Sequence, residues 1–297
     1  MDVSIIIVNY NTREITSQCI ESIYEQTDNI TFEVILIDNN STDGSVEFFS
    51  NDKRIKLIQN RENSGFGHAN NIGIKKASGK YIFCLNSDTF LLNNAIKMLY
   101  DFAESYGKNA VFGTWLLDNQ EKIIHSYGKF PSIKTELYNA LRVYGQRIPY
   151  LSKYCIEYTE IFSEEPKLVD YIIGADMFIP RYVIEISGMF DERYFMYCED
   201  TDWQKRMVEK GIERILINGP KIVHSESKSS SKEGGKSMKK NLLSTKAMFL
   251  YMKKHYHNTN YLFFRTLYAL LRLFPTLSNE YTCKEKSEYL KLLFAII

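Results

Sequence analysis

The sequence has little proline, an odd number of cysteines and no long apolar run. Six prolines and 15 glycines among 297 residues are too few for a collagen-like or low-complexity chain. The five cysteines are scattered, which excludes a CxxC motif and argues against a disulfide framework. The apolar runs have the length of strands, so none of them can span a bilayer as a plain helix. We therefore expect a globular protein of a reducing compartment, the cytoplasm.

Several motifs that would identify a chemistry are also missing. The chain has no GxxxxGK[ST] loop, no GxGxxG after the first strand and no GxSxG elbow. These absences exclude P-loop nucleotide chemistry, a dinucleotide dehydrogenase and a serine hydrolase of the α/β type. No nucleic-acid-binding motif is found, so we expect no nucleic-acid partner. Residues 1–4 lack a basic region and lead into a strand pattern, so we expect no signal peptide.

Two hydrophobic periodicities alternate along the chain. Val3 to Val8 is a run of β-branched residues interrupted by Ser4, which is typical of a strand buried on both faces. Asn11 to Glu14 then has the pattern of a capping box and predicts a helix start. Strands alternating with helices predict an α/β fold with a mostly parallel sheet flanked by helices. Further strands are predicted at 32–37, 55–58, 81–85, 110–117, 169–179 and 214–217, and helices at 67–77, 94–103, 201–210, 241–254, 260–274 and 284–296.

Polar triplets follow three of the predicted strands: Asn9-Tyr10-Asn11, Asp38-Asn39-Asn40 and Asn86-Ser87-Asp88. In parallel sheets, ligands bind beyond the carboxyl ends of the strands, so these triplets are candidate site residues. Asp88 could hold a hard divalent cation together with substrate phosphates. Taken alone, the triplet is more often an Asx turn that leaves a strand and needs no metal.

Three carboxylates crowd against aromatic residues between positions 194 and 203. Like charges and apolar neighbours raise the pKa of Glu199, Asp200 and Asp202, as a general base near neutral pH requires. A helix N-terminus lowers such a pKa, and a negatively charged helix cap is the alternative interpretation. His224 follows the short apolar run 221–223 and is either a metal ligand or an ordinary hydrogen-bonded residue.

The order of these motifs resembles that of glycosyltransferase family 2, the inverting nucleotide-sugar transferases with a GT-A fold. The resemblance covers residues 3 to about 224. The pattern at residues 86–89, with His224 and a later Ser-rich loop, is most similar to the rhamnosyltransferase branch. The segments that carry the resemblance are the first strand with its triplet, Val34 to Asp43, Asn63 to Gly73, Asn86-Ser87-Asp88 at the place of the family's DxD motif, and Phe190-Asp191-Glu192 followed by Glu199-Asp200.

The resemblance implies a role for each of these residues. Asp200 would be the general base that deprotonates the acceptor hydroxyl, and Glu199 would position it or contact the acceptor. Asp88 and His224 would hold Mg²⁺ or Mn²⁺ on the diphosphate. Because the first Asp of DxD is Asn86 here, His224 would carry more of the protein's share of the metal. The donor would be bound by Val8, Tyr10, Asp38, Asn71, Asn86, Ser87 and Asp88, with Asp38 on the nucleotide base.

The whole pattern predicts a metal-dependent, inverting glycosyltransferase. It would move a sugar, with rhamnose among the candidates, from a nucleotide-diphosphate donor to a hydroxyl of a glycan or lipid-linked acceptor in cell-surface polysaccharide synthesis. We expect a GT-A catalytic domain at 1–238, with a nucleotide-sugar half to about residue 117 and an acceptor half at 118–238. The alternatives are a catalytically degenerate sugar-binding protein, suggested by Asn86, and a membrane adaptor.

A basic C-terminal end contrasts with an acidic body. Residues 221–297 contain 14 Lys+Arg and 5 Asp+Glu, whereas residues 1–220 contain 23 and 31. We expect a helical extension at 239–297, in which Arg265 and Arg272 interrupt an apolar stretch and keep it from spanning a bilayer. Such a helix can lie in the interface with its arginines at the headgroups, which predicts peripheral binding to an anionic membrane on the cytoplasmic face. Packing on the catalytic core or on a second subunit of a homo-oligomer is the alternative.

Overall fold

The computed structural model describes residues 1–145, 162–225, 238–276 and 282–294 and divides into two units. The first unit contains described residues 1–130, 162–195 and 199–225, and the second contains 131–145, 196–198, 238–276 and 282–294. Each unit is described by itself. The described part of the expected extension at 239–297 lies in the second unit, together with a helix at 133–145 that the sequence did not predict.

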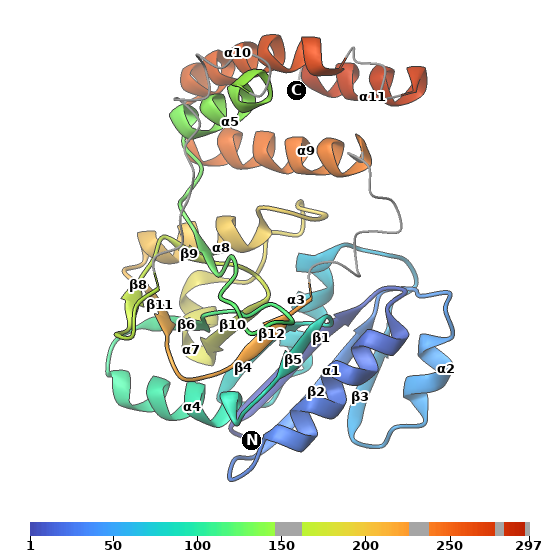
Figure 1. Cartoon of the computed structure of the whole chain (residues 1–297), viewed down its shortest axis with the longest axis vertical. Coiled ribbons are helices and arrows are strands. Elements are labelled where there is room, and N and C mark those ends of the chain that lie inside the picture. The colour runs from blue at the N-terminus through green and yellow to red at the C-terminus, as the bar shows by residue number, and fades with distance from the viewer. Residues whose placement is uncertain (146–161, 226–237, 277–281, 295–297) are drawn as a thin grey trace. The chain divides into compact units, whose positions relative to one another are not determined.

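An eight-stranded sheet forms the centre of the first unit, with the order β3-β2-β1-β4-β10-β6-β11-β8 (Figure 1). The first four strands pair in parallel, as does β6 with β11, whereas β10 runs antiparallel between β4 and β6. The predicted mostly parallel α/β fold is thus confirmed. The strands are β1 (Val3–Asn9), β2 (Phe32–Asp38), β3 (Ile55–Gln59), β4 (Tyr81–Asn86), β6 (Ala110–Thr114), β8 (Lys167–Leu168), β10 (Asp176–Pro180) and β11 (Glu213–Ile217).

Helices cover both faces of this sheet, which is why its strands are apolar runs without alternation. Successive side chains of β1 point to opposite faces. Ile5 packs with α1 and α4, and Ile6 packs with α3 and α8. The helices are α1 (Arg13–Gln26), α2 (Ser45–Ser50) and α4 (Ala95–Tyr106) on one face, and α3 (Phe66–Lys76), α7 (Arg181–Ser187) and α8 (Glu199–Glu209) on the other.

Two small antiparallel pairs complete the described first unit. β5 (Thr89–Leu91) pairs with β12 (Ile222–His224), and His224 lies opposite Thr89. β7 (Tyr127–Gly128) pairs with β9 (Tyr171–Ile172). The first pairing brings His224 to the loop after β4, although 138 residues separate His224 from Asn86.

The expected capping box at Asn11 is wrong. The N-cap of α1 is Thr12, and its side chain makes no capping hydrogen bond. Asn11 adopts the left-handed conformation, with φ of 55°, which asparagine tolerates better than most residues. Its side-chain oxygen accepts a hydrogen bond from the backbone N–H of Thr42 at 2.7 Å. Asn11 therefore connects two loops instead of capping a helix.

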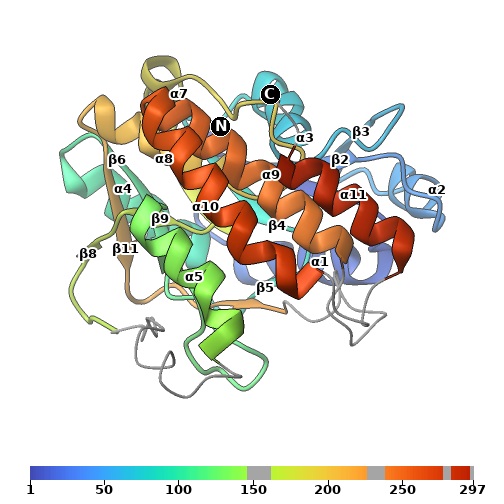
Figure 2. The same ribbon diagram turned by 90° about the horizontal axis from the view of Figure 1, so that it is seen from above.

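The described part of the second unit consists mainly of four helices. They are α5 (Ile133–Gly145), α9 (Met238–His255), α10 (Asn258–Thr276) and α11 (Cys283–Phe294), so the three helices predicted near the C-terminal end are confirmed. Viewed from above, α10 runs between α5 and α11 (Figure 2). Phe249 of α9 packs edge-on against Phe264 and Tyr268 of α10.

The expectation that Arg265 reaches towards lipid headgroups is wrong. Its side chain is buried, donates hydrogen bonds to Tyr261 and to the carbonyl of Leu292, and lies over the ring of Phe249. This arginine therefore holds α9, α10 and α11 together. Leu262, Phe263 and Leu270 of α10 are 60%, 63% and 57% exposed. Across the described ranges, no helix combines the length and the apolar character needed to cross a membrane.

Candidate functional site

The predicted donor-binding residues of three strands share one edge of the sheet. In the parallel register, Asn9 lies opposite Asp38, and Val8 lies opposite Asn86. Tyr10 follows directly and is 48% exposed. The carboxyl ends of β1, β2 and β4 therefore gather the polar triplets, as the sequence predicted.

Asp38 is fully buried at this edge. One carboxylate oxygen accepts a hydrogen bond from the Asn9 side-chain amide at 2.7 Å, and the other accepts from the backbone N–H of Ser41 at 2.8 Å. Thr12 and Thr16 both donate to the amide oxygen of Asn9. Asp38 thus fixes the loop after β2, and its contact with a nucleotide base stays a prediction.

Asn71 lies on α3, away from the strand ends. Its buried side chain donates to the carbonyl of Phe190 and to Glu192, both at 2.9 Å, and accepts from the N–H of Phe190 at 3.1 Å. Asn71 therefore fixes the segment before α8, and its predicted donor contact is untested. Ser87 is half-buried, with its hydroxyl 3.5 Å from that of Thr12.

Asp88 and His224 come together as the resemblance implied. The Nε2 atom of His224 lies 3.3 Å from Oδ1 of Asp88 and 3.4 Å from the side-chain nitrogen of Asn86. The N–H of Ser225 also donates to the carbonyl of Asp88 at 2.9 Å. The pairing of β5 with β12 therefore positions a carboxylate and an imidazole side by side.

This pair fits a divalent cation. Two ligands about 2.1 Å from an octahedral ion, at neighbouring positions, are about 3 Å apart, close to the observed separation. In the described ranges, no three His, Cys, Asp or Glu side chains gather into a metal cluster. Mg²⁺ usually takes one or two protein carboxylates and completes its shell with substrate phosphates and water, so a small protein share is the expected arrangement.

Glu199 and Asp200 begin α8 and are the second candidate group. Glu199 is buried, and its Oε2 atom has no hydrogen-bond partner among the described residues. Burial, and then the neighbouring charge of Asp200, raise the pKa of Glu199. Burial also raises the pKa of Asp200, although hydrogen bonds from the N–H groups of Thr201 and Gly174 oppose the shift. For Glu199 and Asp200, the rise in pKa caused by burial therefore outweighs the lowering expected from the helix N-terminus.

Two glycines allow the loops around this pair to approach one another. A Cβ on Gly174 would lie 3.3 Å from Oδ2 of Asp200, which accepts the hydrogen bond of the Gly174 N–H at 2.8 Å. Gly65 has φ of +86°, and its added Cβ would lie 2.2 Å from the carbonyl oxygen of Phe195. Gly174 thus lets the segment before β10 approach Asp200, and Gly65 lets the start of α3 approach the segment before α8.

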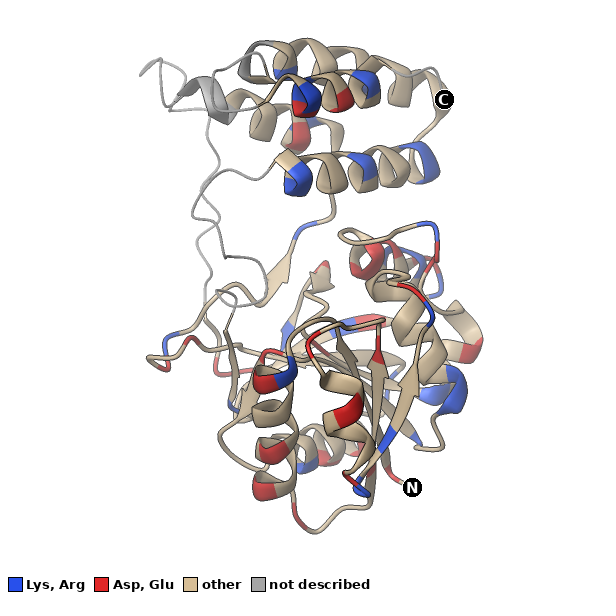
Figure 3. Ribbon diagram, turned by 90° about the vertical axis from the view of Figure 1, so that its right-hand side faces the viewer, with Lys and Arg blue, Asp and Glu red and all other residues tan. Residues whose placement is uncertain are grey.

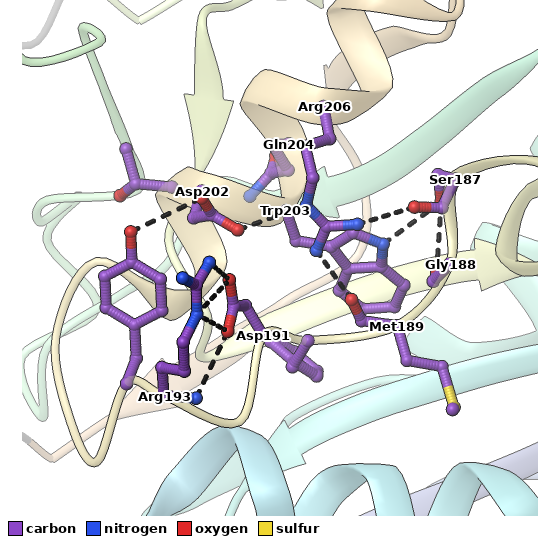
Figure 4. A network of polar contacts seen from close by, with 12 residues as sticks. Ser187, Gly188, Met189, Asp191, Arg193, Asp202, Trp203, Gln204 and Arg206 are labelled. Carbon is purple, nitrogen blue, oxygen red and sulfur yellow. Dashed lines mark hydrogen bonds and ion pairs between the residues drawn. The ribbon is translucent and has the colours of Figure 1, made fainter. Parts of the chain in front are cut away.

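Asp202, the third carboxylate, has a structural environment. It is fully buried and paired with Arg206, whose guanidinium also donates to the carbonyls of Ser187 and Met189 (Figure 4). Trp203 donates to the hydroxyl of Ser187 at 3.0 Å. These contacts tie α8 to the end of α7, so Asp202 is a poor candidate for the acceptor base.

The sequence does not single out two buried polar residues of the sheet, Asn9 and Asp176. Asn9 was seen only as part of a triplet, although it bonds Asp38 directly. Asp176 begins β10, and burial raises its pKa to about 7. A charged residue within the apolar run 175–179 was the available signal, because a carboxylate is rarely buried without a partner.

Several known proteins are similar to this chain in sequence or in fold. GlyG of Streptococcus pneumoniae is 34% identical over 118 residues, which are 38% of this chain and 38% of GlyG. The N-acetylglucosaminyl-diphospho-decaprenol L-rhamnosyltransferase of Mycobacterium tuberculosis is 26% identical over 216 residues, covering 67% of this chain and 68% of that protein. The structure of GalNAc-T7 with UDP, GalNAc and Mn²⁺ matches with a TM-score of 0.64 at 14% identity, covering 97% of this chain and 53% of that one, and supports the fold.

The family model described as glycosyl transferase family 2 matches residues 4–161, more than half of the chain. That segment includes the strand-end triplets and Asp88. The resemblance inferred from the order of motifs is confirmed, and the chain belongs to glycosyl transferase family 2.

Proposed function

We propose that the protein is a metal-dependent, inverting glycosyltransferase that uses a nucleotide-diphosphate sugar. The observation that carries the proposal is the presence of two chemically different groups in one unit. Asp88 and His224 lie 3.3 Å apart at the strand ends, and the buried carboxylates Glu199 and Asp200 begin α8. Transfer by single displacement needs both kinds of group, one for the leaving diphosphate and one for the attacking hydroxyl.

Asp200 is the proposed general base. Hydrogen bonds from Gly174 and Thr201 hold its carboxylate in one orientation, and burial raises its pKa above that of an ordinary aspartate, which strengthens it as a base. Removing the proton from the acceptor hydroxyl strengthens it as a nucleophile, and attack from the face opposite the diphosphate inverts the anomeric centre. Glu199, whose pKa is raised by burial and then by the charge of Asp200, would position the base or contact the acceptor.

Asp88 and His224 would hold Mg²⁺ or Mn²⁺, which neutralises the charge that develops on the leaving diphosphate. The strand-end residues Val8, Tyr10, Asn86 and Ser87 would line the donor around them. The rhamnosyltransferase named above acts, by its name, on a diphospho-decaprenol-linked sugar. We extend this to a glycan or lipid-linked acceptor in cell-surface polysaccharide synthesis, with rhamnose as one candidate sugar.

A coupled assay of nucleoside-diphosphate release tests this function. The full-length protein is incubated with Mn²⁺ and a panel of nucleotide sugars, with and without polyprenyl-diphosphate-linked acceptors. We expect release that depends on both one donor and one acceptor, and an inverted linkage by NMR of the product. Donor binding without any release, across the panel, would favour the catalytically degenerate sugar-binding alternative.

The second unit supports a membrane-bound setting on the cytoplasmic face. Its four helices carry twelve Lys and Arg but three Asp and Glu, and neither α9 nor α10 contains an acidic residue (Figure 3). The exposed Leu262, Phe263 and Leu270 all lie on α10. An apolar helix face in a basic unit fits an anionic lipid surface, where each basic residue near the surface contributes about 1 kcal/mol.

Flotation with anionic vesicles tests this setting. We expect the full-length protein to float at low salt and to lose binding when Leu262, Phe263 and Leu270 are replaced by Ser. Replacing the exposed Thr266 of α10 by Ser is the matched control. A wild-type protein that ignores the vesicles but sediments as a dimer, with the triple variant monomeric, would assign the same face to a homo-oligomer.

A further inference from the structure

Asp176 is a buried carboxylate that the proposed function leaves without a role. It begins β10, and its backbone lies opposite Leu85, the residue before Asn86. The N–H of Asn86 donates to the carbonyl of Ala175 at 2.9 Å. The backbone therefore fixes Asp176 beside the loop that carries Asp88.

Only one of the two carboxylate oxygens of Asp176 accepts hydrogen bonds from the described residues. The N–H and the hydroxyl of Thr114 both donate to its Oδ2 atom, at 2.7 and 2.6 Å. Its Oδ1 atom is buried and has no partner in the part of the chain that the structure describes. A buried polar atom without a hydrogen bond costs about 1–3 kcal/mol, so an interaction that the protein alone does not supply is expected there.

The side chain lies on the face of the sheet that β5 and β12 cover. Residues two apart in a strand share a face, and Phe178 packs in the same cluster as Leu91 of β5 and Ile222 of β12. Ile222 and His224 are two apart on β12 and therefore share the side of that strand that packs in this cluster. β12 thus brings the imidazole to the face of the sheet on which Asp176 lies.

We propose that Asp176 supplies the second negative charge that the motif Asn86-Ser87-Asp88 lacks. It would not be a ligand itself but a positioning residue for the cation that Asp88 and His224 would hold. A charge at this depth acts strongly on a cation because little water screens it. Groups in the outer shell of a metal site commonly orient the ligands and strengthen metal binding. The inference rests on the proposed use of a divalent cation.

Titration of the full-length protein with Mn²⁺, without donor, tests this role. The variant Asp176→Asn keeps the shape of the side chain and an oxygen for Thr114, but removes the charge. We expect Mn²⁺ to bind about 10–100-fold more weakly, as is typical when a partner behind a metal ligand is lost. Asp101→Asn, an exposed residue of α4, is the control and should bind Mn²⁺ as the wild type does.

A double-mutant cycle with Asn86→Asp separates this role from a structural one. If the charge of Asp176 replaces that of the missing aspartate, Asn86→Asp should restore Mn²⁺ affinity to Asp176→Asn and add much less to the wild type. Unchanged Mn²⁺ affinity in a folded Asp176→Asn variant overturns the inference, and so does strict additivity of the two changes. A wild-type protein that binds no Mn²⁺ would refute the metal part of the proposed function as well.

Discussion

The carboxylates at the strand ends and those at the start of α8 are held in opposite ways. Asp38 is fully buried, and each of its oxygens accepts a hydrogen bond, from Asn9 and from Ser41. Glu199 is buried with one oxygen that has no partner among the described residues, and its pKa is raised. Buried polar groups with hydrogen-bond partners stabilise the local structure. Buried polar groups without partners cost stability, and groups with a shifted pKa are typical of active sites.

The two groups of carboxylates also differ in which parts of the fold hold them in place. Asp38 and Asn9 belong to neighbouring strands whose register is fixed over seven residue pairs, so the sheet itself forms their contact. Asp200 instead depends on a loop glycine, Gly174, and on the first turn of its own helix. Variants of Asp38 and Asn9 should therefore affect stability, and variants of Asp200 should affect the reaction.

Asp200→Asn should show the largest effect, and it tests directly whether the carboxylates of α8 serve the reaction. We expect turnover to fall about 10²–10⁴-fold because the general base is lost, while donor affinity changes less than a few fold. Steady-state assays and calorimetry with the donor measure the two quantities. Glu209→Gln, an exposed residue of the same helix, should leave both unchanged. Near-normal turnover of Asp200→Asn would move the base to Glu199.

Asp88→Ala and His224→Ala should each weaken metal-dependent donor binding by about 10–100-fold, since an interaction with a charged group contributes about 1.5–3 kcal/mol. Calorimetry with donor in Mn²⁺ and in EDTA measures the effect. In EDTA, the wild type and both variants should bind the donor equally weakly. A loss in Asp88→Ala alone would reduce His224 to a residue that joins β12 to the loop after β4. Full activity of the wild type in EDTA would refute the metal role.

Asp38→Asn should lower stability rather than turnover. The new amide would place a donor against the side-chain nitrogen of Asn9, in a position that water does not reach. We expect the free energy of unfolding to fall by about 1–3 kcal/mol, measured by urea denaturation. Asp101→Asn is the exposed control. If Asp38→Asn is as stable as the wild type but loses donor affinity, Asp38 is a nucleotide ligand rather than a support.

The sequence predicted the buried strands well and the side-chain partnerships poorly. An apolar run such as Val3 to Val8 is typical of a strand that helices cover on both faces, so it can be recognised from the sequence. In the structure this strand is longer by one residue, Asn9. The helix α5 was missed because the surrounding segment is rich in Tyr, Lys and Glu and has weak periodicity. The capping interpretation of Asn11 failed because its true partner, Thr42, is 31 residues away.

The candidate site shows the same limit. Asp88 and His224 were named because a family motif fixes their identity, and the structure brings them together. Nothing in the local sequence shows that Thr114 and Asp176, 62 residues apart, share two hydrogen bonds. Local patterns reveal which strand a residue belongs to, whereas the order of strands in the sheet decides which residues meet.

Glu199→Gln should have the smallest effect, which is a change in how the free energy of unfolding depends on pH. Burial raises the pKa of Glu199 from its ordinary 4.5 to about 8. Between these two pH values the native state therefore binds more protons than the unfolded state. The free energy of unfolding of the wild type therefore falls as pH rises through this range.

Glutamine carries no charge, so the variant should lose part of that slope, and the remainder belongs to Asp200 and Asp176, whose pKa values are also raised. At pH 8, Glu199→Gln should be more stable than the wild type, because glutamine has no ionised form that would have to stay buried. Urea denaturation from pH 5 to 8 measures the slope, with Glu209→Gln as the control on the same helix. Identical slopes in the wild type and Glu199→Gln would mean that Glu199 ionises in the native protein as it does in the unfolded chain, and that its unpartnered oxygen costs no stability.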